Sequence, residues 1–329
     1  MPDGSGARGR GRYATAALIG LMIVAFLAPV IANDRPILAR VGGRTVAPAL
    51  ADLPVLGVLF DRPEVRLIPW HSPQGEVRVL LRTPVPHSFR GIHLEEALQP
   101  PGGRHLMGTD VLGRDLLARV IHGTRPSLLV GLGATALAVL AGSLLGALAG
   151  LRGGLVDLLV VRLTDVVSCF PPFILALAFV AAAGGGGLAP IIAGIALTRW
   201  TGTARYVRGE VLRLRGEDLW SAARSTGASL PRLAVRHLLP LLASPLAVLA
   251  AFGVAHAIVL ESGLSFVGLG VEPPTPSWGA ILSEARQTLD AAWWPVVFPA
   301  AALLLVLGTL CLAAERGGGP ERGDGTLLG

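Results

Sequence analysis

The chain of 329 residues contains no lysine, so all 28 of its basic residues are arginine. A phosphate-binding loop of the Walker A type needs a lysine on the nucleotide phosphates, and Schiff-base catalysis needs a lysine amine, so both are excluded. The two cysteines, Cys169 and Cys311, are too few for a disulfide framework or a cysteine zinc site. The sequence therefore predicts no ATP site, no metal centre and no cofactor of its own.

Charge is scarce as well. Only 15% of the residues are charged, against roughly 25% in soluble domains, and 52% are hydrophobic. Five stretches lack Asp, Glu and Arg, and each reaches the roughly 20 residues that cross a bilayer core. They are 13–33, 126–151, 166–198, 237–260 and 291–314. The third is too long for one span, and Gly184 to Gly187 divides it. The sequence predicts an all-α membrane protein with six transmembrane helices.

The first apolar stretch is longer than the roughly 7–15 residues of a signal peptide, so we expect a retained anchor. Orientation follows from arginine in the short loops, because cytoplasmic loops carry the excess of positive charge. The arginines that we assign to that side are Arg8, Arg10, Arg12, Arg152, Arg162, Arg205, Arg208, Arg213, Arg215, Arg224, Arg232, Arg236, Arg316 and Arg322. We therefore expect a multi-pass protein of the inner (plasma) membrane with both termini in the cytoplasm, and no nucleic-acid partner.

Four parts of the chain follow from this pattern. Residues 1–33 form a cytoplasmic tail and the first span, and residues 34–105 a proline-rich, irregular periplasmic insertion with a few strands at most. Residues 106–314 form a five-helix core with a cytoplasmic loop at about 205–238, and 315–329 a second tail. Within the core, apolar residues at helical spacing in 107–127 predict an interfacial helix before the second span.

The loop between the fourth and fifth spans contains a short polar helix. Acidic residues open it, where the helix dipole favours negative charge, and Gly227 suits its left-handed C-terminal position. The loop resembles the EAA loop of ABC importer permeases, which docks on a separate ATPase, although Ser221 stands where that motif has glutamate. Without the resemblance, it reads as an ordinary polar connection. The residues that carry it are Glu217, Asp218, Ser221, Ala222, Ala223, Gly227, Leu239 and Pro240.

Three further stretches resemble the same family. Residues 106–115 look like the LGTD-x-x-GRD signature of dipeptide and oligopeptide permeases, and residues 261–271 and 273–279 follow in the order and spacing of the C-type membrane subunit. The tail that follows the sixth span, residues 314–319, lacks the ending that is usual in this family. The motif residues are Gly108, Thr109, Asp110, Gly113, Arg114, Asp115, Pro276, Ser277, Trp278 and Gly279.

The resemblance implies the type I ABC importer transmembrane fold and a permease subunit for di- or oligopeptides. It also implies four kinds of component around it: a second homologous permease forming a heterodimer, two ABC ATPase subunits, a periplasmic substrate-binding protein and the lipid bilayer. An ion-coupled secondary transporter is the alternative, and it needs no ATPase. An intramembrane hydrolase is a further alternative, but the sequence contains neither an HExxH nor a GxSxG motif. Gene neighbourhood discriminates between these alternatives, because adjacent genes for an ATPase and a binding protein would support the importer only.

Two charged residues fall inside predicted spans, where such residues often mark a pathway. Arg199 lies about midway along the fourth span and either faces the translocation cavity or snorkels or pairs. Glu261 lies near the outer end of the fifth span and either lines the pathway or bonds to the turn that follows. His237 and His256 show no metal-ligand spacing, so we expect them to pack.

Overall fold

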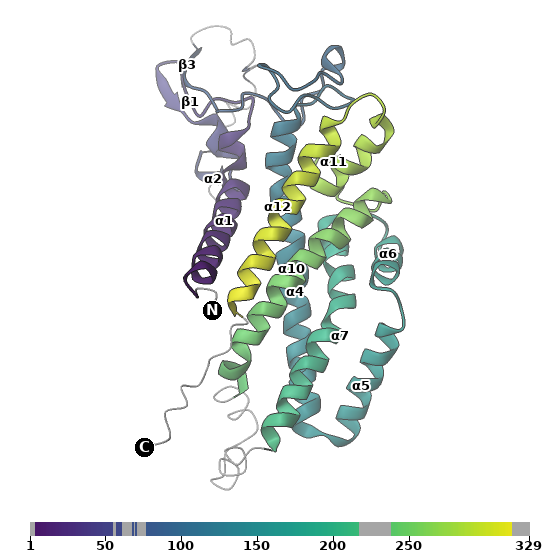
Figure 1. Cartoon of the computed structure of the whole chain (residues 1–329). Helices are drawn as coiled ribbons and strands as arrows, with labels where there is room; N and C mark the ends of the chain where they lie inside the picture. The colour runs from purple at the N-terminus through teal and green to yellow at the C-terminus, as the bar shows by residue number, and fades with distance from the viewer. Residues whose placement is uncertain are drawn as a thin grey trace, which may run out of the picture.

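The computed structural model describes residues 4–54, 57–60, 68, 70, 77–216 and 238–317. They form a bundle of long helices with a small sheet and irregular loops at one end, which we call the sheet end (Figure 1). The first helix begins away from the sheet, and the last helix ends away from it (Figure 1). The helices of the bundle are α1 (Gly4–Ile31), α4 (Leu116–Arg152), α5 (Gly154–Ser168), α6 (Pro172–Ala182), α7 (Leu188–Arg215), α10 (Leu239–Phe266), α11 (Trp278–Ala285) and α12 (Trp294–Gly317).

Within the part of the chain that the structure describes, three helices are long and apolar enough to cross a membrane: α4, α10 and the Trp294–Ala314 part of α12. The α5–α6 pair, bent by 90° at its break, is a fourth if it is one span. In α1 the apolar stretch Ala16–Ile31 is shorter, and α7 carries several arginines. Three to four spans therefore follow from length and composition, and the predicted count of six is not confirmed by them.

The broken span corrects one prediction. We expected its apolar run to begin at 166, after a loop containing Arg162, but α5 is helical from Gly154, so Arg162 lies on a helix. Charged residues on α5 hid it from a search for uncharged stretches. One of them, Asp157, pairs with Arg208 of α7, with 2.7 Å between Oδ2 and Nη2. The bend falls beside Pro171 and Pro172.

Glycines let α4 and α7 approach closely. A Cβ atom on Gly142 would lie 2.5 Å from the Trp200 carbonyl oxygen, and one on Gly146 would lie 2.4 Å from that of Ala204. Small residues allow such contact between helices in lipid, where hydrophobic drive between helices is absent. Gly142 and Gly146 therefore permit the close approach of α4 and α7.

Residues 34–105 contain a three-stranded antiparallel sheet in the order β2 (Arg44–Val46), β1 (Leu38–Val41), β3 (Val77–Leu81). Ala39 of β1 pairs with Val46 on one side and Val79 on the other. Short helical turns η1 (Pro48–Asp52), α2 (Gly57–Phe60) and η2 (Leu94–Glu96) complete the described segment. The few strands expected from the sequence are present among otherwise irregular chain.

The interfacial helix predicted within 107–127 is wrong as a separate element. Residues 107–115 form a looped segment with no helix, and α4 starts only at Leu116, then runs through Pro126 to Arg152 without a break. The Asp115 carboxylate accepts a hydrogen bond from Ala118 N at 2.7 Å, which satisfies an unpaired donor at the start of α4. The charged residues of this stretch, Arg114, Asp115 and Arg119, are buried.

Candidate functional site

Two motifs that lie more than 150 residues apart in the sequence meet at the sheet end. The loop of residues 108–115 precedes α4, and residues 276–279 lead into α11. Trp278 joins them, because its Nε1 donates to Val120 O at 3.1 Å and its backbone N lies 3.4 Å from Ser127 Oγ, both on α4. Pro276 and Gly279 are buried beside it. The structure therefore brings the residues of the two motifs into one cluster.

Four charged residues form its centre, which we call the sheet-end network: Asp110, Arg114, Arg119 and Glu284. Arg114 Nε lies 2.7 Å from Asp110 Oδ2, and Arg119 Nη1 lies 2.5 Å from the same oxygen. Arg119 Nη1 also lies 2.7 Å from Glu284 Oε2, which Arg114 contacts as well. The charges balance, and the Arg119 side chain is only 3% exposed. The network thus neutralises charges that would be costly to bury alone.

Arg119 and Glu284 are the residues that sequence reasoning missed here. Neither was singled out as a site residue from the sequence. The two lie 165 positions apart, so no local spacing connects them. The acid and the arginine in the GRD-type motif were the one available signal that charge gathers at this loop.

The motif glycines and threonine shape the loop around this network. Gly113 has φ +69°, and a Cβ there would lie 1.8 Å from His93 O, so only glycine fits. Gly108 likewise has a positive φ. The Thr109 hydroxyl donates to Glu96 O and accepts from Gln99 N at 2.8 Å, while Thr109 O accepts from Trp294 Nε1 at 3.0 Å. The loop is therefore held to α12 as well as to α4.

Glu261 supports the same region from α10. It is 0% exposed, and its Oε1 accepts hydrogen bonds from Ser265 Oγ at 2.8 Å and Ser277 Oγ at 2.7 Å. Ser277 Oγ also caps α11 by accepting from Ala280 N at 3.1 Å. These contacts fasten α11 to α10, so they favour the structural alternative for Glu261 over a pathway role.

Arg199 lies elsewhere, halfway along α7, where it borders a cavity of about 210 Å³ between α4, α6, α7 and α10. Threonines supply much of the polar lining: Thr135, Thr198, Thr201 and Thr203. No acidic partner contacts Arg199 among the described residues. Of the two environments expected for its charge, the described residues therefore supply the cavity and not an ion pair.

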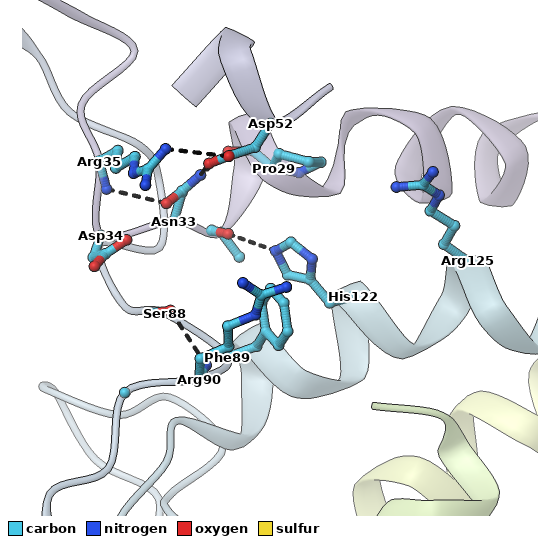
Figure 2. Close-up of a pocket in the computed structure, with 12 residues that line it drawn as sticks. Pro29, Asn33, Asp34, Arg35, Asp52, Ser88, Phe89, Arg90, His122 and Arg125 are labelled. Carbon is cyan, nitrogen blue, oxygen red and sulfur yellow. Dashed lines mark hydrogen bonds and ion pairs between the residues drawn. The ribbon is translucent and has the colours of Figure 1, made fainter. Parts of the chain in front are cut away.

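A larger cavity, of about 460 Å³, opens at the sheet end between the end of α1, η1 and the start of α4. Figure 2 shows its polar lining, with Arg90 stacked on Phe89 and His122 pointing to the backbone that follows α1. His122 Nε2 lies 2.7 Å from Ala32 O, so that nitrogen carries the proton. Asn33 donates to Asp52 at 3.0 Å across the same cavity. Its residues come from distant segments, and sequence reasoning did not identify it.

The predicted docking helix lies outside the described residues, which include neither Glu217, Asp218, Ser221, Ala222, Ala223 nor Gly227. Its flanks are described. Leu239 and Pro240 open α10, with proline in the first turn, and Leu238 and Leu242 pack on Val207 and Val211 of α7. The two ends of the loop therefore emerge from a packed helix pair, at the end of the bundle opposite the sheet (Figure 1).

A family model described as "Binding-protein-dependent transport system inner membrane component" matches residues 142–316, from the middle of α4 to the end of α12. The chain is 38% identical over 240 residues to the di/tripeptide transport system permease protein DppC of Pseudomonas aeruginosa, covering 72% of this chain and 76% of that one. It is also 38% identical over 219 residues to the probable D,D-dipeptide transport system permease protein DdpC of Escherichia coli, covering 67% and 73%.

Among solved structures, one chain of the MetNI methionine ABC transporter in inward-facing conformations has a similar fold. The TM-score is 0.51 at 18% sequence identity, and the match covers 61% of this chain and 95% of the other. At that identity the similarity concerns the fold alone. The match includes nearly the whole MetNI chain, and the part of this chain that remains unmatched is additional to it.

Proposed function

Because this chain belongs to the family of binding-protein-dependent transport system inner membrane components, we propose that it is the permease subunit that carries di- or oligopeptides across the membrane. The observation that carries the proposal is the identity of 38% over 240 residues to a di/tripeptide transport permease. The chain is a permease subunit of an ABC importer. The alternative function, an ion-coupled secondary transporter, is therefore not favoured. The choice of peptide rests on the relatives' names.

Its partners follow from the mechanism of such a system. We propose a heterodimer with a second homologous permease, two ABC ATPase subunits on the cytoplasmic side and a substrate-binding protein on the other. The missing lysine supports an ATPase supplied by other chains, since a phosphate loop requires one. ATP binding would close the ATPases, draw the docking helices together and open the pathway toward the binding protein.

Coupling through the loop is tested by replacing Gly227 with valine in the reconstituted transporter. A β-branched residue in a left-handed position costs about 1–2 kcal/mol, so the docking helix should be misplaced. We expect most peptide uptake to be lost while the partner ATPases still hydrolyse ATP, as measured by radiolabelled uptake and phosphate release in parallel. Gly216→Val is the matched control, because Gly216 has φ −83°, which valine accepts. The permease alone should release no phosphate, and normal uptake by Gly227→Val would refute coupling through this loop.

For the topology we propose six spans, adding α1 and α7 to the four helical units that satisfy length and composition. The arginine distribution supports cytoplasmic termini and a periplasmic insertion. Reporter fusions after Arg236 and after Arg316 should give a cytoplasmic signal, and a fusion after Pro86 a periplasmic one. A periplasmic signal at Arg236 would contradict this arrangement.

For Arg199 we propose a place on the pathway, where it meets the carboxylate of a peptide. Its position beside the 210 Å³ cavity and the absence of an acidic partner among the described residues support this role. Inserting a charge at a helix centre costs roughly 2.5–3.5 kcal/mol on insertion scales. Water in the cavity would hydrate the guanidinium and so offset this cost. Glu261 stays a weaker pathway candidate, given its hydrogen bonds to two serines.

Replacing Arg199 with leucine should reduce the uptake of peptides with a free carboxylate by roughly tenfold or more, since charged hydrogen bonds contribute about 1.5–3 kcal/mol. Uptake of the same peptides with amidated C-termini should be unchanged. Arg199→Lys, which keeps the charge, is the control and should retain part of the discrimination. If Arg199→Leu transports both peptides as well as the unmodified chain does, or fails to assemble, Arg199 is a structural residue.

A further inference from the structure

A second group of polar side chains lies beside the sheet-end network and takes no part in it: His87, Glu96, His105 and Asp115. Ligand atoms of His87, His105 and Asp115 all lie within 4.8 Å of one another. The imidazole rings of His87 and His105 are 4.5 Å apart between centroids. Sequence spacing gave no warning of this group, because its members are nine, nine and ten positions apart along an irregular segment.

His105 has the bonding pattern of a metal ligand. Its Nδ1 lies 2.7 Å from Asp115 Oδ2, and its side chain is 3% exposed. Histidines that bind metals almost always donate their other ring N–H to a carboxylate or carbonyl, which fixes the tautomer. With the proton on Nδ1, Nε2 presents a lone pair, and this buried atom has no hydrogen-bond partner among the described residues.

Two other side chains, Glu96 and His87, offer donor atoms close to the His105 ring. Glu96 Oε2 lies 3.4 Å from His105 Nε2. Two ligands on a tetrahedral zinc ion, each about 2.0–2.1 Å from it, are separated by roughly 3.4 Å. His87 Nε2 bonds to Arg104 O at 3.0 Å, so it carries a proton and its Nδ1 is left as an acceptor.

We propose that His87, Glu96 and His105 form a binding site for a divalent transition metal ion, with zinc the best fit, and that Asp115 orients His105. Two imidazoles and a carboxylate are a ligand set that suits zinc, and a water molecule would take the fourth position. The alternative without a metal is a direct hydrogen bond between His105 Nε2 and Glu96, which requires one additional proton shared by that pair. The two cases differ in zinc binding, so they can be separated by experiment.

The ion would join the irregular segment before residue 106 to the start of α4. Asp115 takes part in both structures, because its Oδ1 caps α4 while its Oδ2 holds His105. Because zinc would bind the folded chain and not the unfolded one, it would stabilise the fold by an amount that grows with the logarithm of the zinc concentration above the dissociation constant. The site would therefore hold this loop in place at the sheet end, next to the two family motifs.

The test uses the full chain, purified in detergent without a histidine tag, treated with a chelator and titrated with zinc chloride. We expect one zinc per chain by calorimetry and elemental analysis, and a rise of several degrees in the thermal unfolding midpoint. Cobalt should produce the visible absorption of a tetrahedral site. His87→Ala and His105→Gln should abolish stoichiometric zinc binding, the rise in the unfolding midpoint and the cobalt absorption. Asp115→Asn should weaken zinc affinity by about 10- to 100-fold while still capping α4.

His93→Ala is the matched control, since His93 lies in the same segment outside the group, and it should bind zinc like the unmodified chain. If His105→Gln fails to fold, His87→Ala decides, because the His87 side chain makes one hydrogen bond, to a backbone carbonyl. The proposal is overturned by the absence of stoichiometric zinc binding. It is equally overturned by His87→Ala binding zinc as tightly as the unmodified chain. None of these measurements depends on the transported solute.

Discussion

Arg119→Met should prevent the sheet end from folding stably, at a cost of about 3–5 kcal/mol, because it removes one partner from a buried ionic network. Arg119 Nη1 contacts both Asp110 and Glu284, and no solvent replaces it, since the side chain is 3% exposed. Arg114 alone would then face two carboxylates. We expect a clear fall in the thermal unfolding midpoint in detergent, and loss of peptide uptake in cells.

Two further variants make this result specific. Arg35→Met removes a partner from a more exposed pair, in which Nη1 lies 3.2 Å from Asp52 Oδ1, and pairs of that kind contribute about 0–1 kcal/mol. Combining Arg119→Met with Glu284→Gln restores the charge balance and should recover part of the lost stability. If Arg119→Met and Arg35→Met have equally small effects, the network does not stabilise this end of the bundle.

Gly146→Val should separate α4 from α7 and destabilise the bundle by about 3 kcal/mol or more, near or above the upper end of the usual cost of overpacking. The first added carbon would lie 2.4 Å from Ala204 O and 3.0 Å from Ala204 Cα, and backbone atoms cannot rotate away as a side chain can. The measurement is the thermal unfolding midpoint together with the yield of monodisperse protein.

Gly308→Val is the matched control, because it makes the same change in the apolar helix α12, where nothing lies within 4 Å of an added Cβ. It should fold like the unmodified chain. A Gly146→Val variant as stable as Gly308→Val would mean that α4 and α7 are not pressed together as described. A further loss at Gly142→Val is expected for the same reason.

The candidate site was only partly readable in the sequence. The two motifs were identified from their residues, and the structure places both at the sheet end. Their contact through Trp278 was not predictable, because the chain between them forms most of the bundle. For Glu261 one hydrogen-bond partner, Ser265, is four positions away on α10, whereas Ser277, at the start of α11, reaches it only because the chain turns back after α10.

Errors in the predicted helix limits have one cause. We looked for stretches without charge, so α5 was missed and α4 was started at Pro126. Charged residues within a helix can be neutralised by a neighbouring element, as Asp157 is by Arg208. The hydropathy of one segment contains no information about the residues that will face it.

The sequence by itself determined the membrane class, the breaks at Pro171 and at Gly184, and membership of the permease family, because these depend on composition and on local order along the chain. Tertiary structure alone decided which charges are buried together: the sheet-end network, the histidine and carboxylate group of His87 and His105, and the cavity beside Arg199. Each joins residues from segments that are distant in sequence. Coulomb and hydrogen-bond energies act through space over a few ångströms, so they become defined only when the helices pack.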